Sequence, residues 1–199
     1  MSTTRISIEQ LEGRRLLSAQ VILAVTATGA NDVIVIDQVG SSGNITVTEN
    51  GVAQTFSLGQ ISRVTVNAGN GADRVDCTTL KVPVSIDGND GDDTIIGSEK
   101  SDRIDGGPGD DSINGGKGND KVRGEEDNDT VRGGKGNDTV EGNDGEDRLT
   151  GDENDDFLDA NDDLFEDTVN GGSGFDRAHI DDDLGITDDT EDTIEDLDT

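Results

Sequence analysis

The chain is poor in cysteine, histidine and aromatic residues. Its 199 residues include no Trp, no Tyr, four Phe, one His and one Cys, Cys77. A single cysteine excludes a disulfide within the chain, so we expect Cys77 to be a free, partly buried thiol, with an intermolecular disulfide as the alternative. No apolar run reaches the ~18 residues that a membrane-spanning helix needs, and we expect no transmembrane segment.

Catalytic signatures are missing as well. The sequence contains neither H-E-x-x-H nor G-x-S-x-G, the motifs of common metalloproteases and serine hydrolases. The only histidine, His179, lies in a short strand-like segment, where an exposed residue without chemistry is the simplest interpretation. We therefore expect a protein that is not an enzyme.

Basic side chains are far fewer than acidic ones. The chain has 15 Lys and Arg against 46 Asp and Glu, a formal net charge of −31. Residues 87–199 hold 39 of the acidic side chains and nine of the basic ones. Such a charge repels nucleic acid and anionic membranes and favours bound cations. Only 29% of the residues are hydrophobic, a composition that by itself is typical of disorder.

A strict nine-residue repeat contradicts disorder. The unit G-x-x-G-x-D-x-U-x, with U an aliphatic residue, runs in register from Gly88 to Asp159. Its eighth position is filled by Ile95, Ile104, Ile113, Val122, Val131, Val140, Leu149 and Leu158. Its sixth position is filled by Asp93, Asp102, Asp111, Asp120, Asp129, Asp138, Asp147 and Asp156. A repeat of this kind predicts a parallel β-roll, conditional on Ca²⁺ bound in its turns.

The closest copies of the unit, GGPGDDSIN (106–114), GGKGNDKVR (115–123) and GGKGNDTVE (133–141), resemble the repeats of the RTX family of secreted bacterial proteins. The resemblance implies an all-β, right-handed parallel β-roll that binds several calcium ions. Each ion would take an Asp and carbonyl oxygens from one turn and the matching set from the turn 18 residues further on. The implied ligands are the eight aspartates above, the carbonyls of Gly106, Gly107, Gly109, Gly115, Gly116, Gly118, Gly133, Gly134 and Gly136, and, as candidates at the ends, Asp73, Asp167 and Asp176.

The physics of the repeat favours the same ion. We expect a turn of six residues and a strand of three, with two units making one coil, so that Ile95, Ile113 and Val131 stack on one wall. One buried aliphatic side chain per nine residues cannot offset the entropy of ordering them. Stacked carboxylates repel unless a cation lies between them, and an oxygen-rich site suits Ca²⁺ better than Mg²⁺ or Zn²⁺.

Three turns depart from the pattern. SEKS (98–101) lacks two glycines, and EEDN (125–128) has Asp127 where glycine is expected. The turn 151–156 has Asn154 at that position. We expect weaker or differently liganded sites in the turns 97–102, 124–129 and 151–156.

The remaining sequence divides into three further segments. Residues 20–66 are rich in Val, Ile and Thr and predict strands at 21–27, 32–38, 44–50, 53–58 and 62–68, with a hairpin turn at Asn50-Gly51. They would start or cap a roll that covers residues 67–180, with a longer turn near Pro83. The acidic residues 181–199 would form a last coil over the open end or a tail.

Residues 1–19 differ in composition from the rest and predict an export-like leader or an N-terminal cap. The segment LEGRRLLS (11–18) resembles the LEPRRLLS start of many exported bacterial proteins, with Gly13 in place of the proline. The simpler alternative is a short helix from Ser7 to Leu17. We therefore expect an exported protein at the cell surface or outside the cell, whose calcium-dependent roll is a structural or binding module.

Two other roles stay open from the sequence. One is a calcium-dependent adhesin or matrix component that binds a surface polysaccharide or a protein. The other is a relative of the RTX-bearing proteases or lipases, which carry a separate catalytic domain that residues 1–66 are too few to supply.

Overall fold

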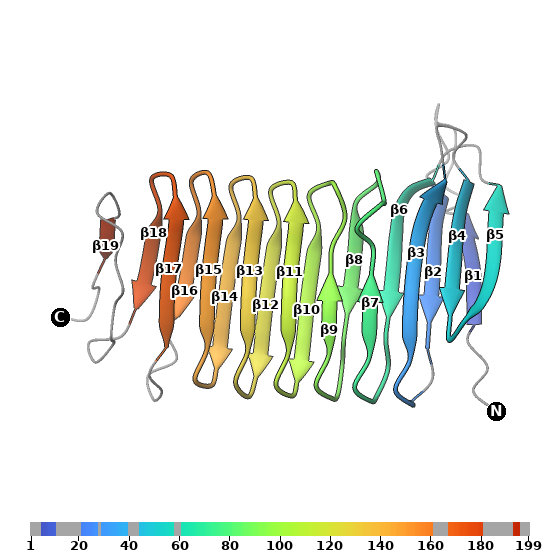
Figure 1. The fold of residues 1–199 in the computed structure, drawn as a ribbon, viewed down its shortest axis with the longest axis horizontal. Helices are drawn as coiled ribbons and strands as arrows, with labels where there is room; N and C mark the ends of the chain where they lie inside the picture. The colour runs from blue at the N-terminus through green and yellow to red at the C-terminus, as the bar shows by residue number, and fades with distance from the viewer. Residues whose placement is uncertain are drawn as a thin grey trace.

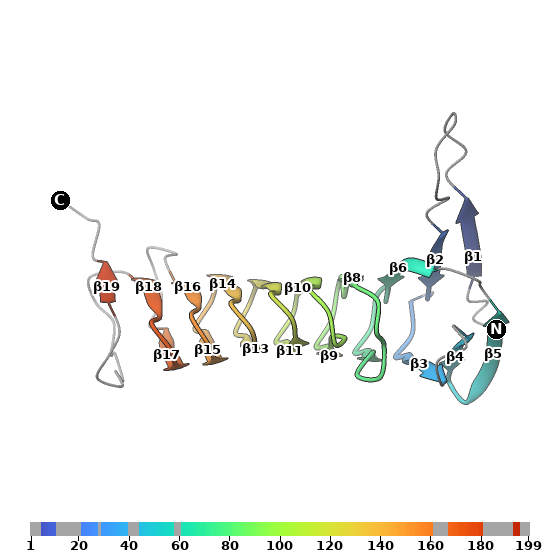
Figure 2. The same ribbon diagram turned by 90° about the horizontal axis from the view of Figure 1, so that it is seen from above.

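The computed structural model describes residues 5–10, 21–27, 29–39, 44–57, 61–160, 167–180 and 193–195. All regular secondary structure in these ranges is β-strand, and none of it is a helix that could cross a membrane. The strands form two sheets that face each other along an elongated molecule (Figures 1 and 2). The expected all-β parallel roll is confirmed.

The ten-stranded sheet, here sheet A, contains every second strand of the roll. Its order is β1 (Arg5–Gln10), β2 (Val21–Thr26), β6 (Ile61–Asn67), β8 (Val84–Asp87), β10 (Arg103–Pro108), β12 (Lys121–Glu126), β14 (Thr139–Asp144), β16 (Phe157–Ala160), β18 (Arg177–Ile180) and β19 (Thr193–Glu195). The nine-stranded sheet B has the order β17 (Thr168–Ser173), β15 (Arg148–Glu153), β13 (Thr130–Lys135), β11 (Ser112–Lys117), β9 (Thr94–Ile96), β7 (Arg74–Asp76), β3 (Val33–Val39), β4 (Asn44–Glu49) and β5 (Val52–Ser57).

From β7 to β18 the chain alternates between the two sheets, and strands two apart in sequence pair in parallel. Ile113 of β11 lies beside Ile95 and Val131, which confirms the expected stack on one wall. Val122 of β12 lies beside Ile104 and Val140 on the other. The eighth-position side chains from Ile95 to Leu158 are all buried, so the core is a double row of aliphatic side chains.

The strands are longer than the three residues expected. In β10 to β15 each strand has six residues and continues through the first three positions of the next repeat. Gly107 of β10, for example, still lies opposite Glu125 of β12. The reason is that neighbouring coils bend at the same position, so their backbones remain side by side beyond the straight segment. Only the fourth to sixth positions of each repeat, such as 109–111, are left as a turn.

The N-terminal segment belongs to the same two sheets. β2 and β6 join sheet A in parallel and β3 joins sheet B, whereas β1, β4 and β5 add antiparallel strands at the end where the N-terminus lies (Figure 1). All five strands predicted between residues 21 and 68 are confirmed to within one residue. The hairpin at Asn50-Gly51 is confirmed too, with positive φ at both residues.

Three expectations are not confirmed as they were made. Residues 7–10 are part of β1, so a helix from Ser7 to Leu17 is wrong there, and residues 11–17 lie outside the described residues. Cys77 is a free thiol, fully rather than partly buried, in the segment 77–83 that forms the longer turn near Pro83. β19 pairs with β18, while the rest of 181–199 lies outside the described residues, and its role stays a prediction.

Candidate metal centre

Aspartates at the sixth repeat position form two columns, one along each edge of the roll. The first aspartate column lies in the turns that lead from sheet A to sheet B, and the second lies in the turns that lead back. All of the side chains are at most 5% exposed. The first column contains Asp32, Asp73, Asp93, Asp111, Asp129, Asp147 and Asp167, and the second contains Asp102, Asp120, Asp138, Asp156 and Asp176.

One carboxylate oxygen of each aspartate holds two coils together. The backbone N–H of Asp111 donates to Oδ1 of Asp129 at 2.7 Å, and the N–H of Asp120 donates to Oδ1 of Asp138 at the same distance. The same bond recurs along both columns. The predicted approach of Asp102 to Asp120 and of Asp111 to Asp129 is therefore confirmed.

The second carboxylate oxygen has no such donor. Oδ2 is buried and accepts no hydrogen bond in Asp32, Asp73, Asp93, Asp111, Asp120, Asp129, Asp138 and Asp156. An ionised carboxylate in this position is costly unless a cation or a proton compensates it. A buried oxygen of this kind, repeated from layer to layer, is a candidate ligand for a cation.

The pKa values of these carboxyl groups are raised for the same reason, because burial disfavours the ionised form. Burial, reinforced by the charge of neighbouring aspartates, raises the pKa of Asp111 to about 7 and that of Asp129 to about 8. Burial raises the pKa of Asp138 to about 6, and the pKa values of Asp93, Asp120 and Asp156 to about 7. Without a metal ion, these carboxyl groups therefore titrate between pH about 6 and about 8, far above the usual range of aspartate.

Glycine at the first repeat position makes room for these oxygens. A Cβ on Gly115 would lie 2.5 Å from the carbonyl oxygen of Gly133 and 2.7 Å from Oδ2 of Asp120. The carboxylate oxygen of one repeat and the carbonyl oxygen of the next coil thus approach the same glycine. The predicted carbonyls of Gly106, Gly115 and Gly133 lie beside the aspartates in this way.

Glycine at the second and fourth positions allows the bend of the turn. Gly107 and Gly109 have φ values of 116° and 133°, which side chains other than glycine rarely adopt. Residues at the same positions of neighbouring coils share this geometry, so their carbonyl oxygens stack in rows. Gly91 O, one coil earlier, lies 2.5 Å from the position that a Cβ on Gly109 would take. Rows of carbonyl oxygens therefore run beside the aspartate columns.

The turn 97–102 is built differently. Ser98 donates to Asp102 twice, from its backbone N–H to Oδ2 at 2.6 Å and from its Oγ to Oδ1 at 2.9 Å. The N–H of Val84 donates to Oδ1 as well, so both oxygens of Asp102 are hydrogen-bonded within the protein. Neither Ser98 nor Lys100 has a positive φ. Donors from the protein thus occupy the place that is left bare in the other turns.

The other two departing turns keep the common backbone shape. Glu125 and Asp127 have φ values of 93° and 75°, and Asp152 and Asn154 both have a φ of 83°. Asn and Asp tolerate this conformation better than most residues, at some cost in strain. The aspartates of these turns, Asp129 and Asp156, keep a bare Oδ2.

The donor chemistry fits a hard divalent cation. In the described part of the chain, no three His, Cys, Asp or Glu side chains converge on one point. Each turn instead offers one carboxylate with several carbonyl oxygens, which suits Ca²⁺ and not Zn²⁺. The only histidine is elsewhere, half-buried on β18 with Nδ1 2.9 Å from Oδ1 of Asp159.

Asp32 is the one member of the columns that the sequence did not reveal. It lies 41 residues before Asp73, far from any repeat. The local signal was Asp32-Val33-Ile34, an aspartate followed two residues later by a buried aliphatic side chain, as in D-x-U. Asp167 and Asp176, the candidates at the other end, continue the columns as Asp73 does.

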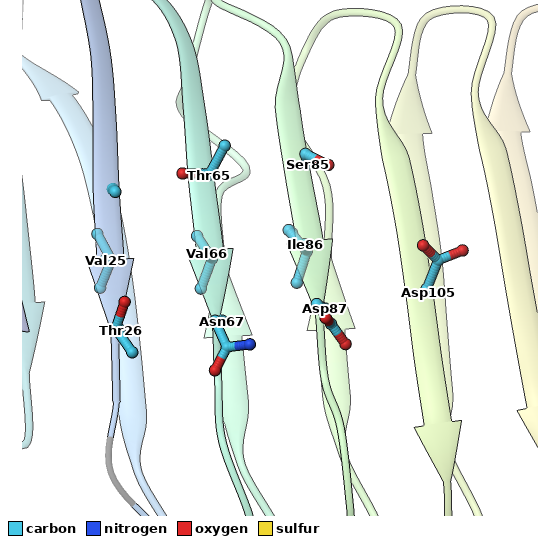
Figure 3. A pocket seen from close by; sticks show the side chains of 10 residues that line it. Val25, Thr26, Thr65, Val66, Asn67, Ser85, Ile86, Asp87 and Asp105 are labelled. Carbon is cyan, nitrogen blue, oxygen red and sulfur yellow. The ribbon is translucent and has the colours of Figure 1, made fainter. Parts of the chain in front are cut away.

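The outer faces of the sheets carry hydrogen-bonded charges. Glu141 pairs with Lys121 and Arg123 on sheet A, and Arg132 pairs with Asp152 on sheet B. A shallow groove of about 270 Å³ crosses sheet A near its N-terminal end, where Thr26, Asn67 and Asp87 lie in one row (Figure 3). None of the aspartates of the two columns lines this groove.

Two stacked sheets joined by turns of aspartates and carbonyl oxygens define a calcium-binding parallel β-roll. The family model of the RTX calcium-binding nonapeptide repeat (4 copies) matches residues 87–122 and 123–158. Residues 87–158 of the chain are therefore RTX-type calcium-binding repeats. Neither a search of curated proteins nor a search of solved structures finds a match to it.

Proposed function

We propose that calcium ions bound in the aspartate columns are what fold this chain and keep its coils stacked. The observation that carries the proposal is the row of buried Oδ2 atoms that accept no hydrogen bond. A small aliphatic core leaves the roll short of stabilising energy, and a ligand that binds only the folded state adds stability that grows with the logarithm of its concentration.

The ligands proposed are the carboxylates of Asp93, Asp111, Asp120, Asp129, Asp138, Asp147 and Asp156. Carbonyl oxygens of the glycine turns 106–109, 115–118 and 133–136 complete them. Asp102 is the exception, because Ser98 and Val84 already donate to both of its oxygens. The bound ion supplies the positive charge, while the turns hold the oxygens in place.

We further propose that residues 67–180 are the calcium-dependent unit and that residues 20–66 cap one of its ends. In support, the antiparallel strands β4 and β5 continue sheet B beyond β3, where a parallel roll strand would otherwise be left without a partner. The acidic segment 181–199 would cover the other end.

The proposed location is outside the cell or at its surface, in a bacterium. Calcium is scarce in cytosol and abundant outside, so a chain that folds only with calcium stays open until it is exported. The LEPRRLLS-like segment supports an export signal in residues 1–19. Mass spectrometry of the mature N-terminus tests this: a chain that keeps these residues outside the cell would exclude a cleaved leader.

A structural role is proposed rather than a catalytic one, and a calcium-dependent adhesin or matrix component is the second candidate. The flat outer faces, with their rows of paired charges such as Arg132 with Asp152, favour contact with a polar partner. Capture of surface polysaccharide or protein in calcium, and its release by chelator, would support this candidate over a self-contained module.

Circular dichroism of the chelated chain, followed by titration with calcium, tests the main proposal. We expect a weak β signal that grows with calcium to a plateau, and no comparable growth with magnesium. A chain that is equally folded and equally heat-resistant in chelator would refute it.

A further inference from the structure

The first aspartate column extends beyond the matched repeats into the N-terminal segment. The N–H of Asp73 donates to Oδ1 of Asp93 at 2.7 Å, and the N–H of Asp32 donates to Oδ1 of Asp73 at 2.6 Å. These bonds join the same atoms as those between the repeats, which are 2.7 or 2.8 Å long. The turn that contains Asp32 is therefore one further layer of the column.

The same bare oxygen is present in this layer. Asp32 and Asp73 are 1% and 2% exposed, and Oδ2 of each accepts no hydrogen bond. Burial raises the pKa of Asp73 as it does in the repeats. Two buried carboxylates in neighbouring layers lack a compensating charge.

The row of carbonyl oxygens continues beside them. Ala30 O lies 2.9 Å from the position that a Cβ on Gly71 would take, and Gly71 O lies close to the same position on Gly91. Gly71 has a φ of 132°, close to the 128° of Gly91, so the turn 68–73 has the backbone shape of the repeats, whereas Ala30 in the turn 29–32 has no positive φ. The carbonyl oxygens of Ala30 and Gly71 thus continue the row that runs beside the first aspartate column.

The first aspartate column ends at Asn50, whose side chain takes the place of the backbone N–H of a further coil. Asn50, in the hairpin between β4 and β5, donates from Nδ2 to Oδ1 of Asp32 at 2.6 Å, the bond that a backbone N–H makes elsewhere. Its own Oδ1 accepts from the N–H of Val33 at 2.9 Å. Asn50 satisfies Oδ1 of Asp32 and leaves Oδ2 bare.

The second column ends in the opposite way. At Asp102 the backbone N–H of Ser98 donates to Oδ2 itself, so no bare oxygen is left. The two columns therefore differ at this end of the roll. Oδ2 of Asp102 accepts a hydrogen bond, whereas Oδ2 of Asp32 accepts none and lacks a compensating positive charge.

We propose a calcium site between the turns 29–32 and 68–73, with the carboxylates of Asp32 and Asp73 and the carbonyls of Ala30 and Gly71 as ligands. It lies outside the family match and rests on the proposed function of the repeats. Because Asp32 and Asp73 are 41 residues apart, an ion here links β3 of the N-terminal segment directly to β7 of the roll. The cap would then dock on the roll only in calcium.

Native mass spectrometry of the full chain in calcium tests the site by counting ions. We expect Asp32→Asn to bind one ion fewer than the wild type, because the amide keeps the bond to Asn50 but places a donor at the bare position. The control is Asp37→Asn, which removes the same charge from β3, the strand that follows Asp32, where Oδ1 of Asp37 accepts from Oγ1 of Thr79 on the outer face. It should leave the count unchanged.

An Asp32→Asn count equal to that of the wild type would overturn the site while leaving the repeats untouched. A wild type that binds no calcium would overturn both the site and the proposed function.

A local probe covers the case in which Asp32→Asn does not fold. The chain has no Trp or Tyr, so Ala30→Trp, at an exposed position in the turn, would sensitise terbium emission only nearby. We expect emission that calcium displaces in Ala30→Trp and that falls several-fold when Asp32→Asn is added, but not when Asp37→Asn is added. Emission absent from Ala30→Trp, or unaffected by Asp32→Asn, would refute the site.

Discussion

The backbone N–H of Asp111 donates a 2.7 Å hydrogen bond to Oδ1 of Asp129, a residue 18 positions later in the chain. The same carboxylate leaves Oδ2 buried and without a donor. Each such aspartate has two separate tasks: one oxygen ties adjacent coils, and the other is available to a cation. Substitutions can separate these tasks.

Asp129→Asn should retain the first task and lose the second. The amide oxygen can still accept from Asp111, while the amide nitrogen replaces the bare oxygen with a donor that repels a cation. We expect calcium to bind this layer at least about tenfold more weakly, a loss of about 1.4 kcal/mol. The metal-free chain should be no less folded, because an uncompensated buried charge has been removed.

Calorimetric calcium titration and circular dichroism in chelator measure the two effects of Asp129→Asn. Asp144→Asn is the control, since it removes one charge from an exposed position in the next layer of the same column. Unchanged calcium binding by Asp129→Asn would speak against Asp129 as a ligand.

Gly115→Ala should destabilise the calcium-loaded roll. The added Cβ would lie 2.5 Å from Gly133 O, so the backbone of two coils must move apart. Overpacking of this kind costs about 1–3 kcal/mol. Thermal unfolding in saturating calcium measures it, with the exposed Ser112→Ala as a control that should stay within about 0.5 kcal/mol of the wild type. A Gly115→Ala variant as stable as the control would show that the coils are packed more loosely.

Low pH should partly stabilise the metal-free roll, as calcium does. The pKa of Asp111 is raised from 3.8 to about 7 in the folded chain and that of Asp129 to about 8, so the metal-free roll binds protons that the unfolded chain has released. The stability that these protons supply is fully present below pH about 4 and is lost as pH rises through about 7 to 8. In chelator, circular dichroism should therefore show more β structure at pH 5 than at pH 8.

Calcium binding should change with pH in the opposite direction. Protons compete for the same oxygens, so calcium affinity should fall as the pH is lowered from about 8 to about 6. If the β signal of the metal-free chain is the same at pH 5 and at pH 8, the bare carboxylates do not have the raised pKa values described above.

Ser98→Gly combined with Lys100→Gly should create a site. The double substitution removes the Oγ that binds Asp102 and restores glycine at both positions where φ is positive in the other turns. We expect one additional calcium ion per chain, counted by native mass spectrometry. The exposed control Ser101→Ala, in the same turn, should add none. An unchanged count in the double variant would show that glycines alone do not make a turn bind.

The strict period is why the sequence predicts so much of the fold. Nine-residue spacing determines which side chains are neighbours, so the stack of Ile95, Ile113 and Val131 follows directly. The same reasoning places Asp111 on Asp129. Local spacing carries this information only while consecutive layers stay 18 to 20 residues apart.

Other features depend on contacts that the period does not encode. Asp32 joins its column across the excursion of β3, β4, β5 and β6, so no spacing pointed to it. The closure of Asp102 by Ser98 depends on a side chain's donors, which the missing glycines of that turn only hinted at. The length of the strands follows from backbone pairing between coils, which the alternation of side chains cannot reveal.

Layers 18 residues apart are held by identical bonds, and the steps from Asp73 to Asp93 and from Asp147 to Asp167 absorb two extra residues without breaking the series. A gene segment that encodes one coil can therefore be duplicated or deleted while both flanking junctions remain compatible. Molecules of this design are free to evolve in length, one coil at a time, as long as their two ends stay closed.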